Sequence, residues 1–127
     1  EPLRPEFSTY GQTQLSVADE AVLAGQLACV EGAGPVLALM GQVDPSQAYG
    51  LGTIGALFKG GWGPDTAGAY QVRQFGLVPR GDGALAPVAF TALPADGTYE
   101  TGQAMLSAAA ETLAADPMQL PVAACQP

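Results

Sequence analysis

The clearest pattern of hydrophobic and polar positions lies in the middle of the chain, in residues 69–92. Here GAYQVRQFGLV and ALAPVAFTAL flank the turn sequence PRGDG. In an extended chain Tyr70, Val72 and Gln74 face one way and the residues between them the other. Two such segments joined by a turn rich in Gly and Asp are typical of a β-hairpin. We therefore predict an antiparallel hairpin at 69–92.

A pattern of helical period follows at residues 99–115. Its apolar face consists of Leu106, Ala109, Ala110 and Leu113. Thr98 or Thr101 can cap the helix, and Glu100 suits its first turn. Because the residue before a proline rarely adopts helical geometry, Pro117 ends the segment. We predict one helix at about 99–115.

The first third of the chain is harder to interpret. Ser16 and Asp19 have the spacing of a capping box, and apolar residues recur at helical intervals up to Val30. Gly25 interrupts that pattern, and VLAGQLACV reads equally well as one bent strand or two short ones. We favour strands for residues 16–31, with the helix as the alternative. The continuous apolar run PVLALMGQV, residues 35–43, also predicts a strand.

Residues 47–65 are rich in glycine and show no sustained period, which predicts a long loop with at most a short apolar segment. Within it GLGTIG, residues 50–55, matches the G-x-G-x-x-G pattern of dinucleotide-binding turns. That mechanism needs a strand immediately before the glycines and a helix immediately after them. Neither fits here, so we expect no cofactor. The glycines would instead let the backbone pack closely, and we favour a neighbouring subunit as its contact.

These segments predict a single β-rich α+β domain at 13–127, with an antiparallel sheet or a small barrel-like core. Residues 1–12 read as an extended arm because Pro2 and Pro5 disfavour a helix. The apolar residues of this arm are suited to lying on a neighbouring surface: Leu3, Phe7 and Tyr10.

Charged residues make up only 13% of the chain, and the formal net charge is −8. A nucleic-acid site needs several Lys or Arg side chains on one face, whereas this chain has four in all, scattered along it. An anionic membrane surface is disfavoured for the same reason, and no apolar run is long enough to span a bilayer. A surface with so few charges is easier to tolerate in a subunit of an assembly.

The absence of histidine excludes Ser-His-Asp and Cys-His catalysis. Asp44, Asp65, Asp82 and Asp96 all stand in turn sequences, where turn chemistry explains them without a catalytic role. No ligand spacing for zinc or calcium is present. We therefore expect a non-enzymatic protein with no metal and no cofactor.

The tripeptide RGD, at Arg80–Asp82, matches an integrin-recognition sequence, and the tip of the predicted hairpin would display it. The same residues also suit a β-turn, which is the interpretation that we favour.

Cys29 and Cys125 are the two cysteines of the chain. They lack C-x-x-C spacing and have no histidine to complete a zinc site. We expect a disulfide that ties the end of the chain to its early part, with two buried thiols as the alternative. Such a bond would indicate an oxidising setting, extracellular, periplasmic or on a virion.

The segment AVLAGQLACVEGAGPVLAL, followed by turns, hairpins and an Ala-rich helix, resembles the small head-decoration proteins of tailed phages. The resemblance covers about residues 15–40 and the order of the elements. It implies an extended N-terminal arm and trimeric assembly on a capsid, and it transfers no functional residue.

We therefore expect a structural subunit at an extracellular or virion surface, acting as a homo-oligomer or in a larger assembly that could include a capsid protein. Trp62 stands alone in the glycine-rich segment and either anchors it to the core or contacts a neighbouring subunit. The alternative function is a secreted monomeric module that holds a small ligand or glycan near residues 47–65.

Overall fold

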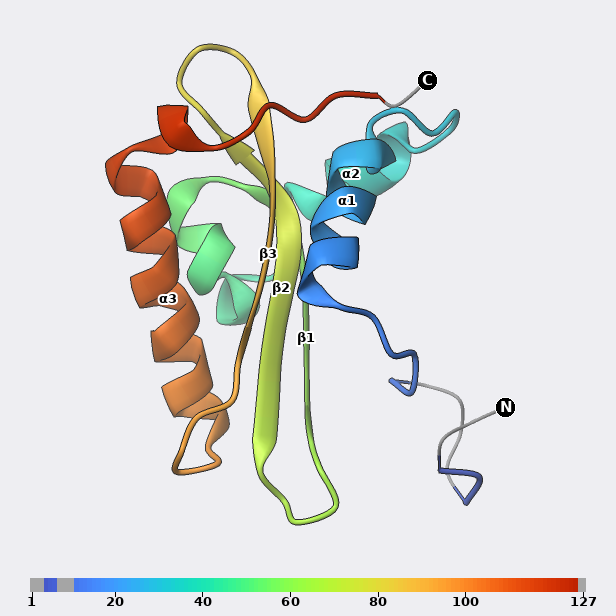
Figure 1. Ribbon diagram of the computed structural model, residues 1–127, viewed down its shortest axis with the longest axis vertical. Helices are drawn as coiled ribbons and strands as arrows, with labels where there is room; N and C mark the ends of the chain where they lie inside the picture. The colour runs from blue at the N-terminus through green and yellow to red at the C-terminus, as the bar shows by residue number, and fades with distance from the viewer. Residues whose placement is uncertain (1–3, 7–10, 126–127) are drawn as a thin grey trace.

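The computed structural model describes residues 4–6 and 11–125. Helices cover both faces of a three-stranded antiparallel sheet with the strand order β1-β2-β3 (Figure 1). The helices are α1 (Val17–Leu27), α2 (Gly34–Met40) and α3 (Tyr99–Ala115), and the strands are β1 (Leu57–Pro64), β2 (Tyr70–Pro79) and β3 (Leu85–Ala92). Three short 3₁₀ helices complete the fold: η1 (Pro45–Gln47), η2 (Gly50–Ile54) and η3 (Pro117–Gln119). The α+β class is confirmed, whereas the sheet is open and the barrel-like core is not confirmed.

The predicted hairpin is present as β2 and β3. Its strands pair in antiparallel register, with Phe75 opposite Ala89, and the Arg80 N–H donates to the Ala84 carbonyl 3.0 Å away to close the turn. The alternation predicted for β2 places Gln74 on the face covered by η2 and α3. Arg73 lies on the opposite face, which α1 covers, and forms an ion pair with Glu20 at 3.0 Å. Alternation along one strand therefore supplies both layers of the core.

The predicted C-terminal helix is also present. The Thr98 hydroxyl caps it by accepting from the Thr101 N–H at 3.2 Å. Leu106 and Ala110 are buried and face the sheet, as their spacing predicts. Gly102 allows the helix to pass directly over Val72, because a Cβ there would collide with the valine side chain.

The strands predicted at 16–31 and 35–43 are wrong, because both segments form helices. Ser16 caps α1 by accepting from the Asp19 N–H at 3.0 Å, so the capping-box alternative is the one that the chain adopts. Gly25 does not break the helix. It lies against β3, where its Cβ position is only 3.3 Å from Pro87, so it is the site of closest packing between helix and sheet. Pro35 suits the first turn of α2.

The long loop predicted at 47–65 is also wrong. This segment contains η2 and the whole of β1, which pairs with β2 along eight residues and forms an edge of the sheet. Gly55 ends η2 with a φ of 73°, a backbone conformation that glycine adopts without strain. Propensity disfavours glycine in strands, but the backbone pairing with β2 holds the sequence GGWG extended.

Candidate functional site

The predicted disulfide joins Cys29 to Cys125, with 5.6 Å between their Cα atoms. It connects the loop after α1 to the C-terminal residues, which cross the end of the sheet (Figure 1). There the Ala123 N–H donates to the Leu85 carbonyl at 2.7 Å, and the Gln26 side chain donates to the Ala124 carbonyl at 2.9 Å. We call residues 117–125 the C-terminal strap. Its disulfide is compatible with an oxidising location.

Arg80 holds the same strap from the hairpin turn. Its guanidinium donates to the Leu120 carbonyl at 2.6 Å and forms an ion pair with Asp82 at 3.3 Å. Only 10% of the Arg80 side chain is exposed. The RGD tripeptide therefore lies at the turn, but its arginine is folded onto the strap and is not displayed as an adhesion motif requires.

The aspartates of the four predicted turns share one arrangement. Each carboxylate accepts a hydrogen bond from the backbone N–H two residues further on: Asp44 from Ser46, Asp65 from Ala67, Asp82 from Ala84 and Asp96 from Thr98. These are Asx turns, as their sequence contexts predict. In the part of the chain that the structure describes, no group of three or more acidic or cysteine side chains could hold a metal ion. No helix of that part could cross a membrane.

Asp96 should titrate below an ordinary aspartate. The Thr101 hydroxyl and then the Thr98 N–H donate to its carboxylate and hold its pKa below the usual 3.8. A lowered folded-state pKa stabilises the fold above the unfolded-state pKa, and this stabilisation is lost as the pH falls through the folded-state value. Thr101→Val should therefore raise the pKa of Asp96, as measured by carboxyl-carbon NMR. The control Thr112→Val removes a hydroxyl from the last turn of α3, far from Asp96, and should leave that pKa unchanged. Equal titration in both variants would contradict the assignment.

The segment GLGTIG is part of the protein's own core. The Gly50 N–H donates to the Ser107 hydroxyl of α3 at 3.0 Å, and the Leu51 N–H donates to the Gln74 side chain at 2.8 Å. Gln74 in turn donates to the Tyr49 carbonyl at 2.9 Å. The glycines do allow close packing, here within the protein's own core, and the expected contact of this segment with a neighbouring subunit stays a prediction. Sequence reasoning missed Gln74, although its place on the same strand face as Val72 was a signal of burial.

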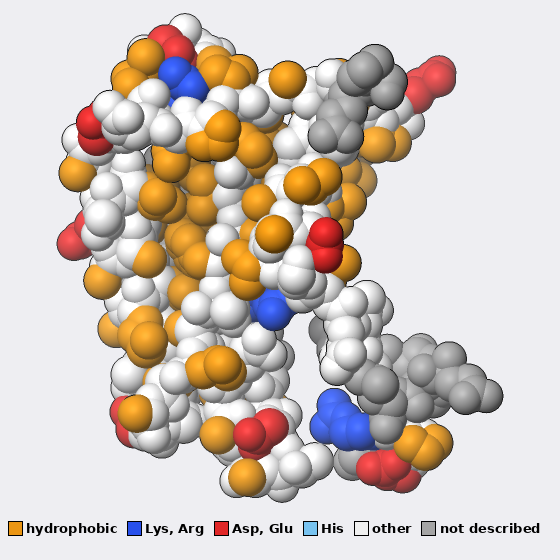
Figure 2. Space-filling model, in the orientation of Figure 1, with side chains coloured by type: hydrophobic (Ala, Val, Ile, Leu, Met, Phe, Trp, Pro, Cys, Tyr) orange, Lys and Arg blue, Asp and Glu red, His pale blue; other side chains and the backbone are white. Residues whose placement is uncertain are grey.

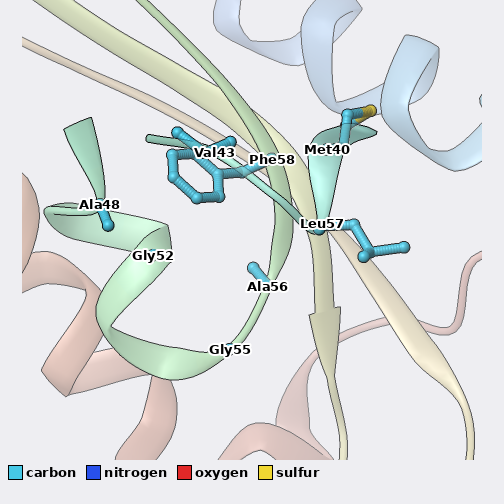
Figure 3. Close-up of a pocket in the computed structure, with 9 residues that line it drawn as sticks. Met40, Val43, Ala48, Gly52, Gly55, Ala56, Leu57 and Phe58 are labelled. Atoms are coloured by element: carbon cyan, nitrogen blue, oxygen red, sulfur yellow. The ribbon is translucent and has the colours of Figure 1, made fainter. Parts of the chain in front are cut away.

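A pocket of about 230 Å³ opens between the end of α2, η2 and the start of β1 (Figure 3). Every residue that lines it is apolar or glycine: Met40, Gly41, Val43, Ala48, Gly52, Gly55, Ala56, Leu57 and Phe58. The pocket therefore offers shape and hydrophobic contact but no side-chain group for acid–base or nucleophilic chemistry.

Helices α1 and α2 expose an unusual amount of apolar side chain. Five large apolar residues in this part of the chain are exposed: Val22 and Leu23 on α1, Val30 in the loop between the helices, and Val36 and Leu39 on α2. We refer to these residues together as the α1–α2 apolar surface. Figure 2 shows hydrophobic side chains gathered where the two helices lie, at the upper right. Leu39 is 69% exposed and directly precedes Met40, which lines the pocket. The apolar run predicted as a strand is thus a largely exposed helix.

A group of aromatic rings packs around Tyr99 at the start of α3. Trp62 stacks on Tyr99 with 5.2 Å between ring centroids and 26° between planes. Tyr49 and Tyr70 also contact Tyr99, with centroid distances of 6.0 and 5.9 Å. Trp62 nevertheless remains 44% exposed. It therefore both packs on the protein and presents a surface, and its predicted role as an assembly contact stays a prediction.

The other predicted assembly contacts, Leu3, Phe7 and Tyr10, lie outside the described residues. The chain matches no protein-family model, no curated protein and no solved structure.

Proposed function

We propose that the protein is a non-enzymatic structural subunit that works in an oxidising environment and self-associates through the α1–α2 apolar surface. The observation that carries this proposal is the exposure of Val36 and Leu39 on α2, whose last residue, Met40, lines the pocket. Exposed apolar patches of this kind mark interaction sites in soluble proteins.

The charges around this surface favour association with another apolar surface. No Lys or Arg occurs between residues 5 and 58, and Asp19 and Glu31 are the exposed acids of α1 and of the loop that follows it. Glu20 is paired with Arg73 below the helix. Covering apolar surface stabilises a complex by about 25 cal/mol per Å² before the cost of association, and here few charges would be desolvated.

A second copy of the chain is the occupant that the shape suggests. Leu39 is exposed on α2, and the next residue, Met40, lines the pocket at the end of the same helix, so a protruding side chain and a hollow occur at the same end of α2. A two-fold interface requires a surface that is complementary to itself. Leu39 of each copy can then enter the pocket of the other.

The disulfide supports the location, since such bonds persist outside reducing compartments. A virion surface is one such setting, and the phage-decoration resemblance makes it our preferred example. The arm at residues 1–12 would add contacts to a neighbour already bound through the α1–α2 apolar surface.

Leu39→Glu should prevent self-association, because it places a charge in the centre of the proposed interface. The matched control is Leu93→Glu, which changes a leucine of equal exposure (70%) in the segment between β3 and α3. Sedimentation velocity over a range of concentrations should show oligomers for the wild type and for Leu93→Glu. The dissociation constant of Leu39→Glu should be at least about 100-fold weaker.

A wild type that stays monomeric at millimolar concentration would overturn the proposed self-association. An oligomer that Leu39→Glu leaves intact would show that the interface lies elsewhere on the molecule.

A further inference from the structure

The indole of Trp62 has one covered face and one open face. Tyr99 stacks on one side of the ring, nearly parallel to it. Because 44% of the tryptophan is still exposed, the solvent-accessible area lies on the opposite face and the rim. Because Tyr99 already holds the indole in place, the ring loses little conformational freedom when a ligand covers its open face, and this favours binding.

On the same face of β1, the position next to this indole is a glycine and has no side chain. Gly60 lies two residues before Trp62 and shares its face of β1. A Cβ at Gly60 would lie 3.8 Å from Gln74 and 3.9 Å from the Tyr49 hydroxyl, so nothing closer fills the space above the backbone. The indole therefore lies next to the backbone of Gly60, and the Tyr49 hydroxyl lies beyond that glycine.

The hydroxyl of Tyr49 forms a hydrogen bond with the Tyr99 hydroxyl at 3.3 Å. Only one of the two protons is used in this bond, so the pair of hydroxyls keeps one O–H donor for an outside acceptor. Burial and then the Tyr99 hydrogen bond raise the pKa of Tyr49, so this group keeps its proton at physiological pH. The Trp62 indole N–H has no hydrogen-bond partner among the described residues and is a second donor.

We propose that Trp62, Gly60 and Tyr49 form a binding site for a neutral carbohydrate, with one pyranose ring stacked on the open face of the indole. A sugar with equatorial hydroxyls has an apolar C–H face and a polar rim. The apolar face fits the indole, and the rim meets the hydroxyls of the Tyr49–Tyr99 pair and the Trp62 N–H. Gly60 leaves room for the ring beside the strand.

A neutral sugar is favoured over a charged one. None of the residues that form the site is charged, and the net charge of −8 disfavours anionic polysaccharides. The site lies on the sheet face that carries η2 and α3, opposite the face that α1 covers. It therefore goes beyond the proposed self-association and is independent of the α1–α2 apolar surface.

Because Trp62 is the one tryptophan of the chain, its fluorescence reports directly on the site. Titration of the full chain with cellohexaose and with chitohexaose should change the emission of Trp62 in a saturable manner for at least one of them. Isothermal titration calorimetry should give the same dissociation constant.

Gly60→Val should weaken sugar binding at least about tenfold, because its side chain fills the space above the strand. A Cβ at Gly60 meets its neighbours at ordinary contact distances, and the two methyl groups of valine extend beyond it into the proposed site. The control is Gly61→Val on the opposite face of the same strand, where a Cβ meets nothing within 4 Å. It changes strand propensity equally and should leave the affinity within about twofold. Tyr49→Phe keeps the ring, loses the donor and should also weaken binding.

Near-UV circular dichroism of each variant verifies that it is folded. The proposal is overturned if neither sugar binds the folded wild type at millimolar concentration. It is also overturned if Gly60→Val and Gly61→Val bind equally. An emission change that follows protein concentration alone, without sugar, would instead assign the open face of Trp62 to a protein interface and would likewise refute the carbohydrate site.

Discussion

Replacement of both Cys29 and Cys125 by serine should lower the free energy of unfolding by about 4 to 5 kcal/mol in the chain-entropy description of disulfides. The two cysteines are 96 positions apart, so the bond closes a loop over most of the unfolded chain. In the folded state it joins the loop after α1 to the C-terminal strap. Guanidinium denaturation of the wild type and the double variant measures the difference.

Two controls separate the bond from the side chains. Reduction of the wild type should produce the same loss of stability, and reducing agent should leave the double variant unchanged. Native-state hydrogen exchange should show faster exchange in the strap, where Ala123 donates to Leu85. If the oxidised wild type and the double variant unfold at the same denaturant concentration, the disulfide contributes nothing to stability and the expectation is wrong.

Gln74→Leu should lower the free energy of unfolding by about 2 to 4 kcal/mol, because it leaves the buried Leu51 N–H and the partly buried Tyr49 carbonyl without partners. The side chain of Gln74 is fully buried and joins the Leu51 N–H and the Tyr49 carbonyl to the central strand. Leucine has a similar size but cannot form either hydrogen bond. Because Leu51 is itself buried, water cannot readily replace the lost partner.

Gln71→Leu is the matched control for this change. Gln71 lies on the other face of β2, is partly exposed and donates to the Thr91 hydroxyl at 3.1 Å. Its replacement should cost less than about 1 kcal/mol, since water can solvate the groups left behind. Denaturation curves that place both variants at the same midpoint would show that the Gln74 hydrogen bonds are not the link between η2 and the sheet.

The hairpin and the C-terminal helix were predictable because each is specified within its own segment. In β2 the alternation around Val72 is continuous, and the turn at Arg80 follows it directly. In α3 the cap at Thr98 predicts where the helix begins, the apolar face predicts the helix itself, and Pro117 predicts where it ends. The four turn aspartates were predictable for the same reason, since an Asx turn involves only its next two or three residues.

Helices α1 and α2 and strand β1 were not predictable, because the structure that each local sequence favours differs from the one that its tertiary contacts impose. In the sequence Gly25 indicates a break in a helix. In the folded protein it lies against β3, where the missing side chain allows α1 to pack closely on Pro87. The apolar run at 35–43 reads as a buried strand because most such runs are buried, whereas α2 leaves Val36 and Leu39 in contact with solvent. Glycines disfavour a strand at β1, and only its pairing with β2 overrides that preference.

The features of the candidate sites also divide into those that the sequence determines and those that only the tertiary structure decides. The sequence by itself determined the low charge, the absence of histidine chemistry and the pair Cys29 and Cys125, because composition and residue identity need no geometry. Only the tertiary structure decided that Gln74 joins η2 to β2, that Arg80 holds the strap and that Trp62 stacks on Tyr99. Each of these contacts joins residues at least 23 positions apart, and their distance in space depends on how the helices pack on the sheet.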